Sequence, residues 1–312
     1  MWRAVTYRVV DAVPTLLFVL TLVFIAMRVL PGDPALAVLG EHATITQLTE
    51  FRHKIGLDLP LWRQYVNFIR DAATFKFGNS FASNFSVAEL VRLNLPYTVE
   101  LTFVATVIGT VLAVPMGVVA AVRRGTALDD STRVFSLIGY AVPDFFLGAI
   151  LLIVFALDLN WFPINGGGDG IIDRLWHVAL PALALGLIKA AFVSRLTRAS
   201  LLEVMRKNYV RTARAKGLTE HRVIYRHALR NALLPMITGL GLSILSTLSG
   251  SVAIELIFGR PGLGSMLVGA IETRDYPVIQ AGIVVFSLFV VLVNLAMDIV
   301  YTLVDPRVGT AA

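Results

Sequence analysis

Six stretches of this sequence are each long and apolar enough to cross a lipid bilayer as a helix, which requires about 20 residues. They cover roughly residues 9–30, 98–122, 134–157, 177–196, 235–258 and 278–303. Hydrophobic residues make up 56% of the chain and charged residues 15%, whereas soluble domains have about 45–50% and about 25%. We therefore expect an all-α membrane protein with six transmembrane helices.

The first and last spans are bounded by recognisable residues. Residues 31–34 include two prolines and a glycine, which cannot continue the first helix. The first apolar stretch exceeds the roughly 7–15 apolar residues of a signal peptide, so we expect it to remain as a span. Asp275, which precedes Tyr276 and Pro277, is the predicted N-cap of the sixth span.

Lysine and arginine are concentrated in alternate loops. Residues 189–233 carry eleven of them with two acids, and residues 123–133 carry three arginines. By contrast, residues 158–176 carry one arginine and residues 259–277 carry two. Because basic loops stay in the cytoplasm, both termini are predicted to be cytoplasmic. Residues 31–97 carry six Lys/Arg, but segments longer than about 60 residues translocate largely regardless of charge.

These spans divide the chain into four parts. Residues 1–30 form an N-terminal transmembrane helix and residues 31–97 an extracytoplasmic segment. Residues 98–305 form a transmembrane core with a cytoplasmic loop at 197–234, and residues 306–312 form a C-terminal tail. The extracytoplasmic segment suits either a cap over a pore mouth or a docking surface for an external partner, and the residues do not decide between them.

The sequence contains no motif that indicates a reaction. No lysine follows a glycine, as it would in an ATP-binding P-loop, and the motifs His-Glu-x-x-His and Gly-x-Ser-x-Gly do not occur. There is no cysteine, and the five histidines are scattered. We expect no enzyme activity, no cofactor and no metal site. Nucleic acid is a poor candidate partner because the basic residues are attached to membrane-spanning helices.

Two features suggest a pore, and each has a plainer alternative. Asp144 lies within the third span beside Pro143. It suits either a pore lining or a position near the outer interface, where its carboxylate reaches water. In the fifth span, small residues recur at spacings of three and four and share one helix face: Gly239, Ser243, Ser246, Thr247 and Gly250. This face suits either a path for a polar solute or close helix packing.

The basic loop is predicted to be an amphipathic helical hairpin. Residues 198–216 favour a helix that ends at Gly217, and residues 219–230 favour a second helix. Arg222, Arg226 and Arg230 are four residues apart and share one face of the second helix. The alternative is an ordinary positive-inside loop that touches anionic lipid.

Several motifs, in order along the chain, resemble the permease subunits of bacterial ABC importers, in the branch that handles dipeptides, oligopeptides, glutathione and nickel. The most specific is the loop sequence that ends in Arg211, Thr212, Ala213, Arg214, Ala215, Lys216 and Gly217. It is followed by His227-Ala228-Leu229-Arg230-Asn231 and by Leu234-Pro235. Further matches occur at residues 30–34, 56–58, 195–199, 261–264, 274–278 and 305–307.

The resemblance implies a type I ABC importer permease fold in the bacterial cytoplasmic (inner) membrane. It implies that residues 211–217 couple the chain to a separate ATPase, although the usual leading Glu and first Ala are replaced by Arg211 and Thr212. The implied partners are a second homologous permease, two ATP-binding subunits and an extracytoplasmic solute-binding protein, besides membrane lipid. The chain would form half of a pore for peptides. The alternative is an ATP-independent transporter or channel for small polar solutes.

Overall fold

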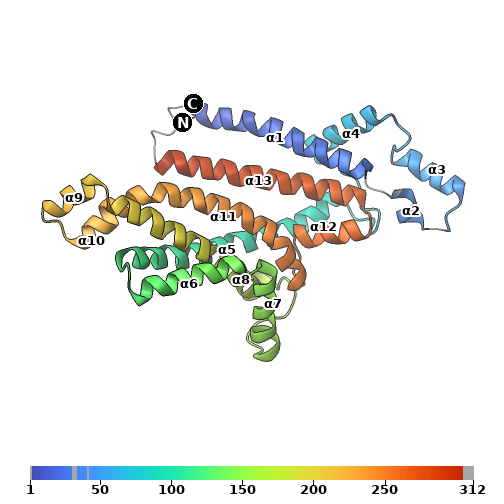
Figure 1. Ribbon diagram of the computed structural model, residues 1–312. Coiled ribbons are helices and arrows are strands. Elements are labelled where there is room, and N and C mark those ends of the chain that lie inside the picture. The colour runs from blue at the N-terminus through green and yellow to red at the C-terminus, as the bar shows by residue number, and fades with distance from the viewer. Residues whose placement is uncertain (1, 30–33, 41, 305–312) are drawn as a thin grey trace. The chain divides into compact units, whose positions relative to one another are not determined.

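The computed structural model describes residues 2–29, 34–40 and 42–304, which form helices joined by short loops (Figure 1). The predicted first-span boundary at residues 31–33, the motif at 305–307 and the tail at 306–312 lie outside the described residues. The chain forms two compact units. The first comprises the described residues of Met1–Val5, Thr98–Arg260 and Val293–Ala312, and the second comprises those of Thr6–Tyr97 and Pro261–Leu292.

The helices follow in sequence order with few long connections. From the N-terminus they are α1 (Trp2–Val29), α2 (Pro34–Leu39), α3 (Ile45–Lys54), α4 (Leu61–Thr74) and α5 (Val87–Val122). Next come α6 (Ala127–Ala141), α7 (Asp144–Leu151), the π-helix η1 (Leu152–Asp158), α8 (Gly170–Met205) and α9 (Asn208–Ala215). The chain continues with α10 (Glu220–Arg222), the π-helix η2 (Val223–Ala228), α11 (Leu229–Ile257), α12 (Leu263–Glu272) and α13 (Tyr276–Val304).

Four helical segments among the described residues are long and apolar enough to cross a membrane: Val87–Val122, Gly170–Met205, Glu220–Ile257 and Tyr276–Met297. A bent pair of helices, Ala127–Ala141 with Asp144–Asp158, gives a fifth segment, and α1 adds the shorter apolar helix Val13–Val29. The chain therefore has several apolar spans. The number six and the cytoplasmic placement of both termini stay predictions.

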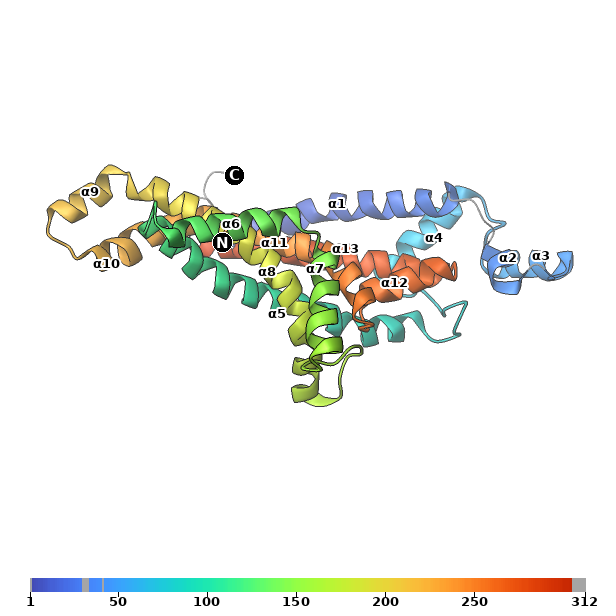
Figure 2. The ribbon, with the colours of Figure 1, turned by 60° about the horizontal axis from the view of Figure 1, so that its bottom comes forward.

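The third span differs from the continuous helix predicted over residues 134–157. Its two halves, α6 and α7, are bent by 103° relative to one another (Figure 2). Val142 and Pro143 are extended between them, since the proline ring restricts the preceding residue to an extended conformation. A second difference is that α8 continues to Met205, past the predicted end at 196.

The first unit is built around α8, which packs against α6, α7 and α11. Small residues allow these close approaches. A Cβ atom added at Gly139 would lie 2.3 Å from the Cβ of Ala191 on α8, and one at Gly186 would lie 2.8 Å from Ile108 on α5. Side chains larger than hydrogen at these positions would force the helices apart, which destabilises a close-packed interior.

In the second unit, α4 presents its apolar face to α1. Phe68 and Ala72 join a core with Leu20, Val23 and Phe24. Two polar contacts fix the same pair of helices: Tyr65 Oη lies 2.7 Å from Thr21 Oγ1, and Arg28 Nε donates to Gln64 Oε1 at 2.8 Å. The amphipathic part of the predicted extracytoplasmic segment is thus a packed helix.

Asp275 lies directly before α13, at the predicted N-cap position, and its carboxylate forms hydrogen bonds with a segment far away in the sequence. It accepts hydrogen bonds from Ser80 Oγ at 2.5 Å and from the backbone N–H groups of Phe81 and Ala82 at 3.1 and 3.2 Å. Asp275 is 2% exposed. Ile279 N–H donates to the backbone oxygen of Asp275 at 3.0 Å, as at the start of a helix, while the Asp275 side chain holds a distant loop of the same unit.

We predict that Asp275→Ala releases this loop. A hydrogen bond to a charged group contributes about 1.5–3 kcal/mol, so the amides of Phe81 and Ala82 should exchange hydrogen about tenfold faster or more. Mass spectrometry of hydrogen–deuterium exchange measures this change. Asp71→Ala is the control, because the Asp71 carboxylate pairs at 3.3 Å only with the exposed side chain of Arg70. Unchanged exchange in the Asp275 variant would contradict the assignment.

Candidate functional site

A cavity of about 510 Å³ lies among α6, α7, α8 and α11 of the first unit. Its polar lining comes from Asp144, Lys189, Ser243, Ser246 and Thr247, and its aromatic lining from Tyr140 and Phe192. Four of the six residues predicted as a pore lining are therefore brought together. The remaining two, Gly239 and Gly250, are not among the lining residues.

The break after α6 places Asp144 at this cavity. Val142 N–H still donates to Ile138 O at 3.1 Å, which closes α6, and Pro143 has no N–H to continue the ladder. Asp144 is then the first residue of α7. A carboxylate in the first turn of a helix is favoured by the helix dipole, so the local sequence supports this conformation.

Gly250 on α11 provides the room that the carboxylate occupies. A Cβ atom added at Gly250 would lie 2.4 Å from Asp144 Oδ2. Gly239 has a separate role, since a Cβ there would lie 2.0 Å from the Leu196 side chain of α8. The predicted small-residue face of α11 therefore divides: its glycines admit neighbouring side chains, while Ser243, Ser246 and Thr247 line the cavity.

Lys189 is a cavity residue that the sequence analysis missed, because it was counted with the basic loop. It lies well inside α8 and is 3% exposed. Its Nζ donates to Thr106 Oγ1 on α5 at 2.6 Å, and its alkyl chain lies against Gly109. The signal was present in the sequence, since residue 189 falls within the predicted fourth span.

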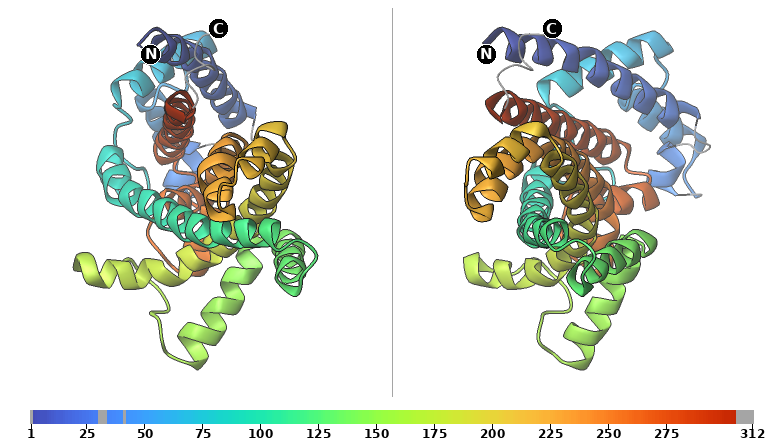
Figure 3. Two further views of the ribbon diagram at one scale, coloured as in Figure 1. Left: turned by 90° about the vertical axis from the view of Figure 1, so that its left-hand side faces the viewer. Right: turned by 60° about the vertical axis from the view of Figure 1, so that its left-hand side comes forward.

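The predicted loop at 197–234 comprises the end of α8, then α9, α10 and η2, and the start of α11. Helices α9 and α10 extend beyond the ends of α5 and α6 (Figures 1 and 2), and in Figure 3 this end of the first unit faces the viewer. The segment predicted to couple to an ATPase occupies α9 and the turn after it. Of its residues, Ala213 is buried with Val210 in a core shared with α8 and η2, whereas Arg211, Thr212, Arg214, Ala215, Lys216 and Gly217 are exposed. The single helix predicted over 198–216 is interrupted at Arg206 and Lys207, between α8 and α9.

Two contacts fix the end of α9. Gly217 adopts a left-handed φ of 76° and its N–H donates to Arg214 O at 2.9 Å, which is a common helix ending. The Arg214 guanidinium donates to both carboxylate oxygens of Glu220, at 2.6 and 3.0 Å. This pairing joins the end of α9 to the start of α10.

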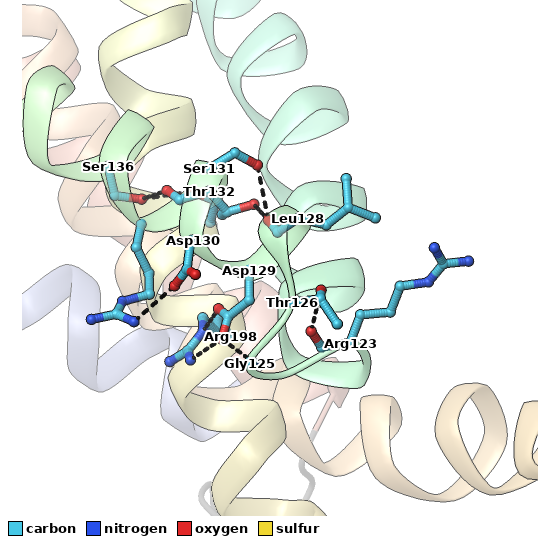
Figure 4. A network of polar contacts seen from close by, with 12 residues as sticks. Arg123, Gly125, Thr126, Leu128, Asp129, Asp130, Ser131, Thr132, Ser136 and Arg198 are labelled. Carbon is cyan, nitrogen blue, oxygen red and sulfur yellow. Dashed lines mark hydrogen bonds and ion pairs between the residues drawn. The ribbon is translucent and has the colours of Figure 1, made fainter.

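A buried ion pair ties the turn between α5 and α6 to α8 (Figure 4). Asp129 is 1% exposed and accepts from Arg198 Nε and Nη2 at 2.5 and 2.8 Å, and from Gly125 N–H at 3.0 Å. Asp129 lies in the first turn of α6, so the ion pair joins α6 and its preceding turn to α8.

We predict that Asp129→Asn destabilises the protein far more than Asp130→Asn does. Removing one partner of a buried ion pair costs about 3–5 kcal/mol, because the other charge is left uncompensated. Asp130 is a matched control, since its pair with Arg133 is more than half exposed on both sides and such pairs contribute about 0–1 kcal/mol. Thermal unfolding in detergent measures both variants. Equal melting temperatures of the two variants would contradict a stabilising role of the ion pair between Asp129 and Arg198.

No group of three or more His, Asp or Glu side chains suited to a metal ion occurs among the described residues. The polar side-chain groups that line the cavity are one carboxylate, one ammonium, the phenol of Tyr140 and the hydroxyls of two serines and one threonine. Such a lining can contact a polar solute through a few directed interactions.

Comparison with known families assigns nearly the whole chain. Residues 113–310 match the family described as binding-protein-dependent transport system inner membrane component, and residues 1–102 match the corresponding N-terminal family.

Similar proteins of known name cover the chain almost completely. The di/tripeptide transport system permease protein DppB of Pseudomonas aeruginosa is 38% identical, and the match covers 95% of each chain. The glutathione transport system permease protein GsiC of Escherichia coli is 39% identical over 99% of each chain. The oligopeptide transport system permease protein AppB of Bacillus subtilis is 39% identical over 96% of this chain and 97% of that one.

A solved structure of the MetNI methionine ABC transporter, in an inward-facing conformation, shares the fold. Its TM-score is 0.57 at 19% identity, and the match covers 70% of this chain and 97% of the other. The likeness is one of fold alone, and it confirms the fold class expected from the sequence.

Proposed function

We propose that this chain, which belongs to the family of binding-protein-dependent transport system inner membrane components, forms half of the pore of an ATP-driven peptide importer. It is a multi-pass protein of the bacterial inner membrane. The cavity of about 510 Å³ at Asp144 carries the proposal, because its size lies within the roughly 300–1,000 Å³ of small-molecule sites.

The peptide substrate is supported by the relatives. They are named for di- and tripeptides, for oligopeptides and for glutathione, which is itself a tripeptide. Hydroxyl groups that line the cavity suit such solutes, because they can accept or donate hydrogen bonds to amide groups of any sequence. The alternative of an ATP-independent transporter has no comparable support.

We assign ATP hydrolysis to a separate subunit, which would bind the exposed surface of α9. Two ATPase subunits, a second homologous permease and an extracytoplasmic solute-binding protein would complete the importer. The exposed basic side chains of Arg211, Arg214 and Lys216 favour an acidic or polar groove on the ATPase. Val210 and Ala213 join this surface to the transmembrane helices through the core that they share with Val204 and Val223.

The turn after α9 gives a test of coupling. Gly217→Val places a β-branched residue at a left-handed φ of 76°, which should distort the turn. Gly217→Asn is the matched control, since asparagine tolerates this conformation. We expect the valine variant to insert into the membrane but to lose co-purification with the ATPase and peptide uptake, while the asparagine variant keeps both. Normal uptake in the valine variant would contradict the proposal that residues 211–217 couple the chain to the ATPase.

A second test concerns the pore. Ser246 is exposed on α11 and lines the cavity, whereas Ser249 is exposed on the same helix and does not. We predict that Ser246→Phe fills the cavity and blocks peptide uptake into proteoliposomes, while Ser249→Phe leaves uptake unchanged. Both variants should assemble with the ATPase subunits, because neither side chain is buried. If Ser246→Phe instead prevents assembly, the α11 face serves packing and not transport.

A further inference from the structure

Asp144 presents a carboxylate to the cavity without an ionic partner. Among the residues that the structure describes, no Lys, Arg or His nitrogen forms an ion pair with it within 4.0 Å. A Cβ atom added at Gly250 on α11 would lie 2.4 Å from its Oδ2. A carboxylate inside a membrane span is costly unless it is compensated, so its partner is expected to come from outside the chain.

Lys189 does not provide this compensation. It is the other charged residue in the cavity lining, but its ammonium donates to Thr106 Oγ1 at 2.6 Å. Its alkyl chain lies against Gly109 on α5. The cavity therefore holds an acid and a base that are not paired with each other.

The helix dipole explains why an acid is tolerated at the start of α7, but not why it faces a cavity. Two further observations concern the cavity itself. Gly250 leaves space for the carboxylate, which any larger residue would displace. Ser246 contributes an exposed hydroxyl to the same lining. Together they make a site with one fixed negative charge and a neutral polar neighbour.

We propose that Asp144 binds the free α-ammonium group of a peptide as it passes through the pore. An ammonium has three N–H donors and a carboxylate accepts several, so the contact is a charge-assisted hydrogen bond that replaces the missing partner. The proposal rests on the proposed function and adds a substrate preference: peptides with a free amino terminus are favoured over those whose amino terminus is acylated.

The absence of cysteine from the chain allows the charge at this position to be removed and restored. The experiment uses Asp144→Cys in the complete importer, reconstituted in liposomes, with uptake of trialanine as the readout. Loss of a charge-assisted hydrogen bond should lower uptake about 10- to 100-fold. Reaction with 2-sulfonatoethyl methanethiosulfonate should restore most of the rate, and reaction with the 2-trimethylammonioethyl reagent should not.

The controls are Ser249→Cys and the unmodified complex, treated with the same reagents. Asp144→Glu should keep more uptake than Asp144→Asn does, because it keeps the charge. Wild-type uptake in Asp144→Asn, or the same rate after both reagents, would overturn the proposal.

A second measurement keeps Asp144 in place and does not depend on how its variants fold. Ser246→Cys is labelled with the 2-sulfonatoethyl reagent in the presence of trialanine or N-acetyl-trialanine. Trialanine should slow the labelling, and the acetylated peptide should slow it much less. Equal protection by both peptides would leave the cavity as the transport path but overturn the ammonium contact. Protection by neither, together with normal uptake in Ser246→Phe, would overturn the proposed path as well.

Discussion

A protein backbone inside a bilayer has to satisfy its hydrogen bonds without water, so a helix can be interrupted only where protein or a water-filled cavity covers the break. In the first unit this constraint acts at Val142 and Pro143, between α6 and α7. Helices α8 and α11 cover the break through close contacts of small residues, including Gly139 with Ala191 and Gly148 with Ile254. The cavity exists because the chain bends here and its neighbours close around the bend.

Ion pairs of the first unit lie near the two ends of α8, and the middle of α8 lines the cavity. Near its start, Arg174 donates to Glu100 of α5 at 3.1 Å, and Arg260 donates to the same carboxylate at 2.9 Å. Near its other end, Arg198 is held by Asp129. Between these anchors, Lys189 and Phe192 line the cavity. Charges that stabilise the fold are thus paired, and the unpaired carboxylate of Asp144 stands apart from them.

Apolar length predicted a helical chain with several apolar spans, because it depends on local composition. Pro143 lies within the continuous span predicted over residues 134–157, but the bend of 103° was not predicted, since the angle depends on the helices that pack against it. The small-residue face of α11 was left open between packing and lining for the same reason. Gly250 and Ser246 share that face, yet their roles depend on whether Asp144 of another helix or the cavity lies opposite.

Lys189 and Asp275 have roles that a single sequence does not reveal. Lys189 was counted with the basic loop because charge alternation does not register the depth of a residue within a helix. Asp275 stands at a helix start, where an N-cap is the local expectation, but Ser80 and the following amides lie nearly 200 residues away in sequence. Contacts of this range are set by the tertiary fold, and local patterns carry no trace of them.

The connection between the two candidate sites follows from continuity of the helices. From the exposed surface of α9, the chain reaches the cavity in both directions: backward through residues 206–207 to α8, and forward through residues 216–219 to α10, η2 and α11, which follow one another without a loop. The core of Val204, Val210 and Val223 joins these paths next to α9. A displacement of α9 by a bound ATPase would therefore move Lys189 and Ser246 together, relative to the start of α7. Because Gly250 packs directly against Asp144, even a small shift of α11 would change the space around the carboxylate. The contact between Gly250 and Asp144 would then make the affinity of the Asp144 carboxylate for a substrate ammonium depend on the conformational state of the proposed ATPase.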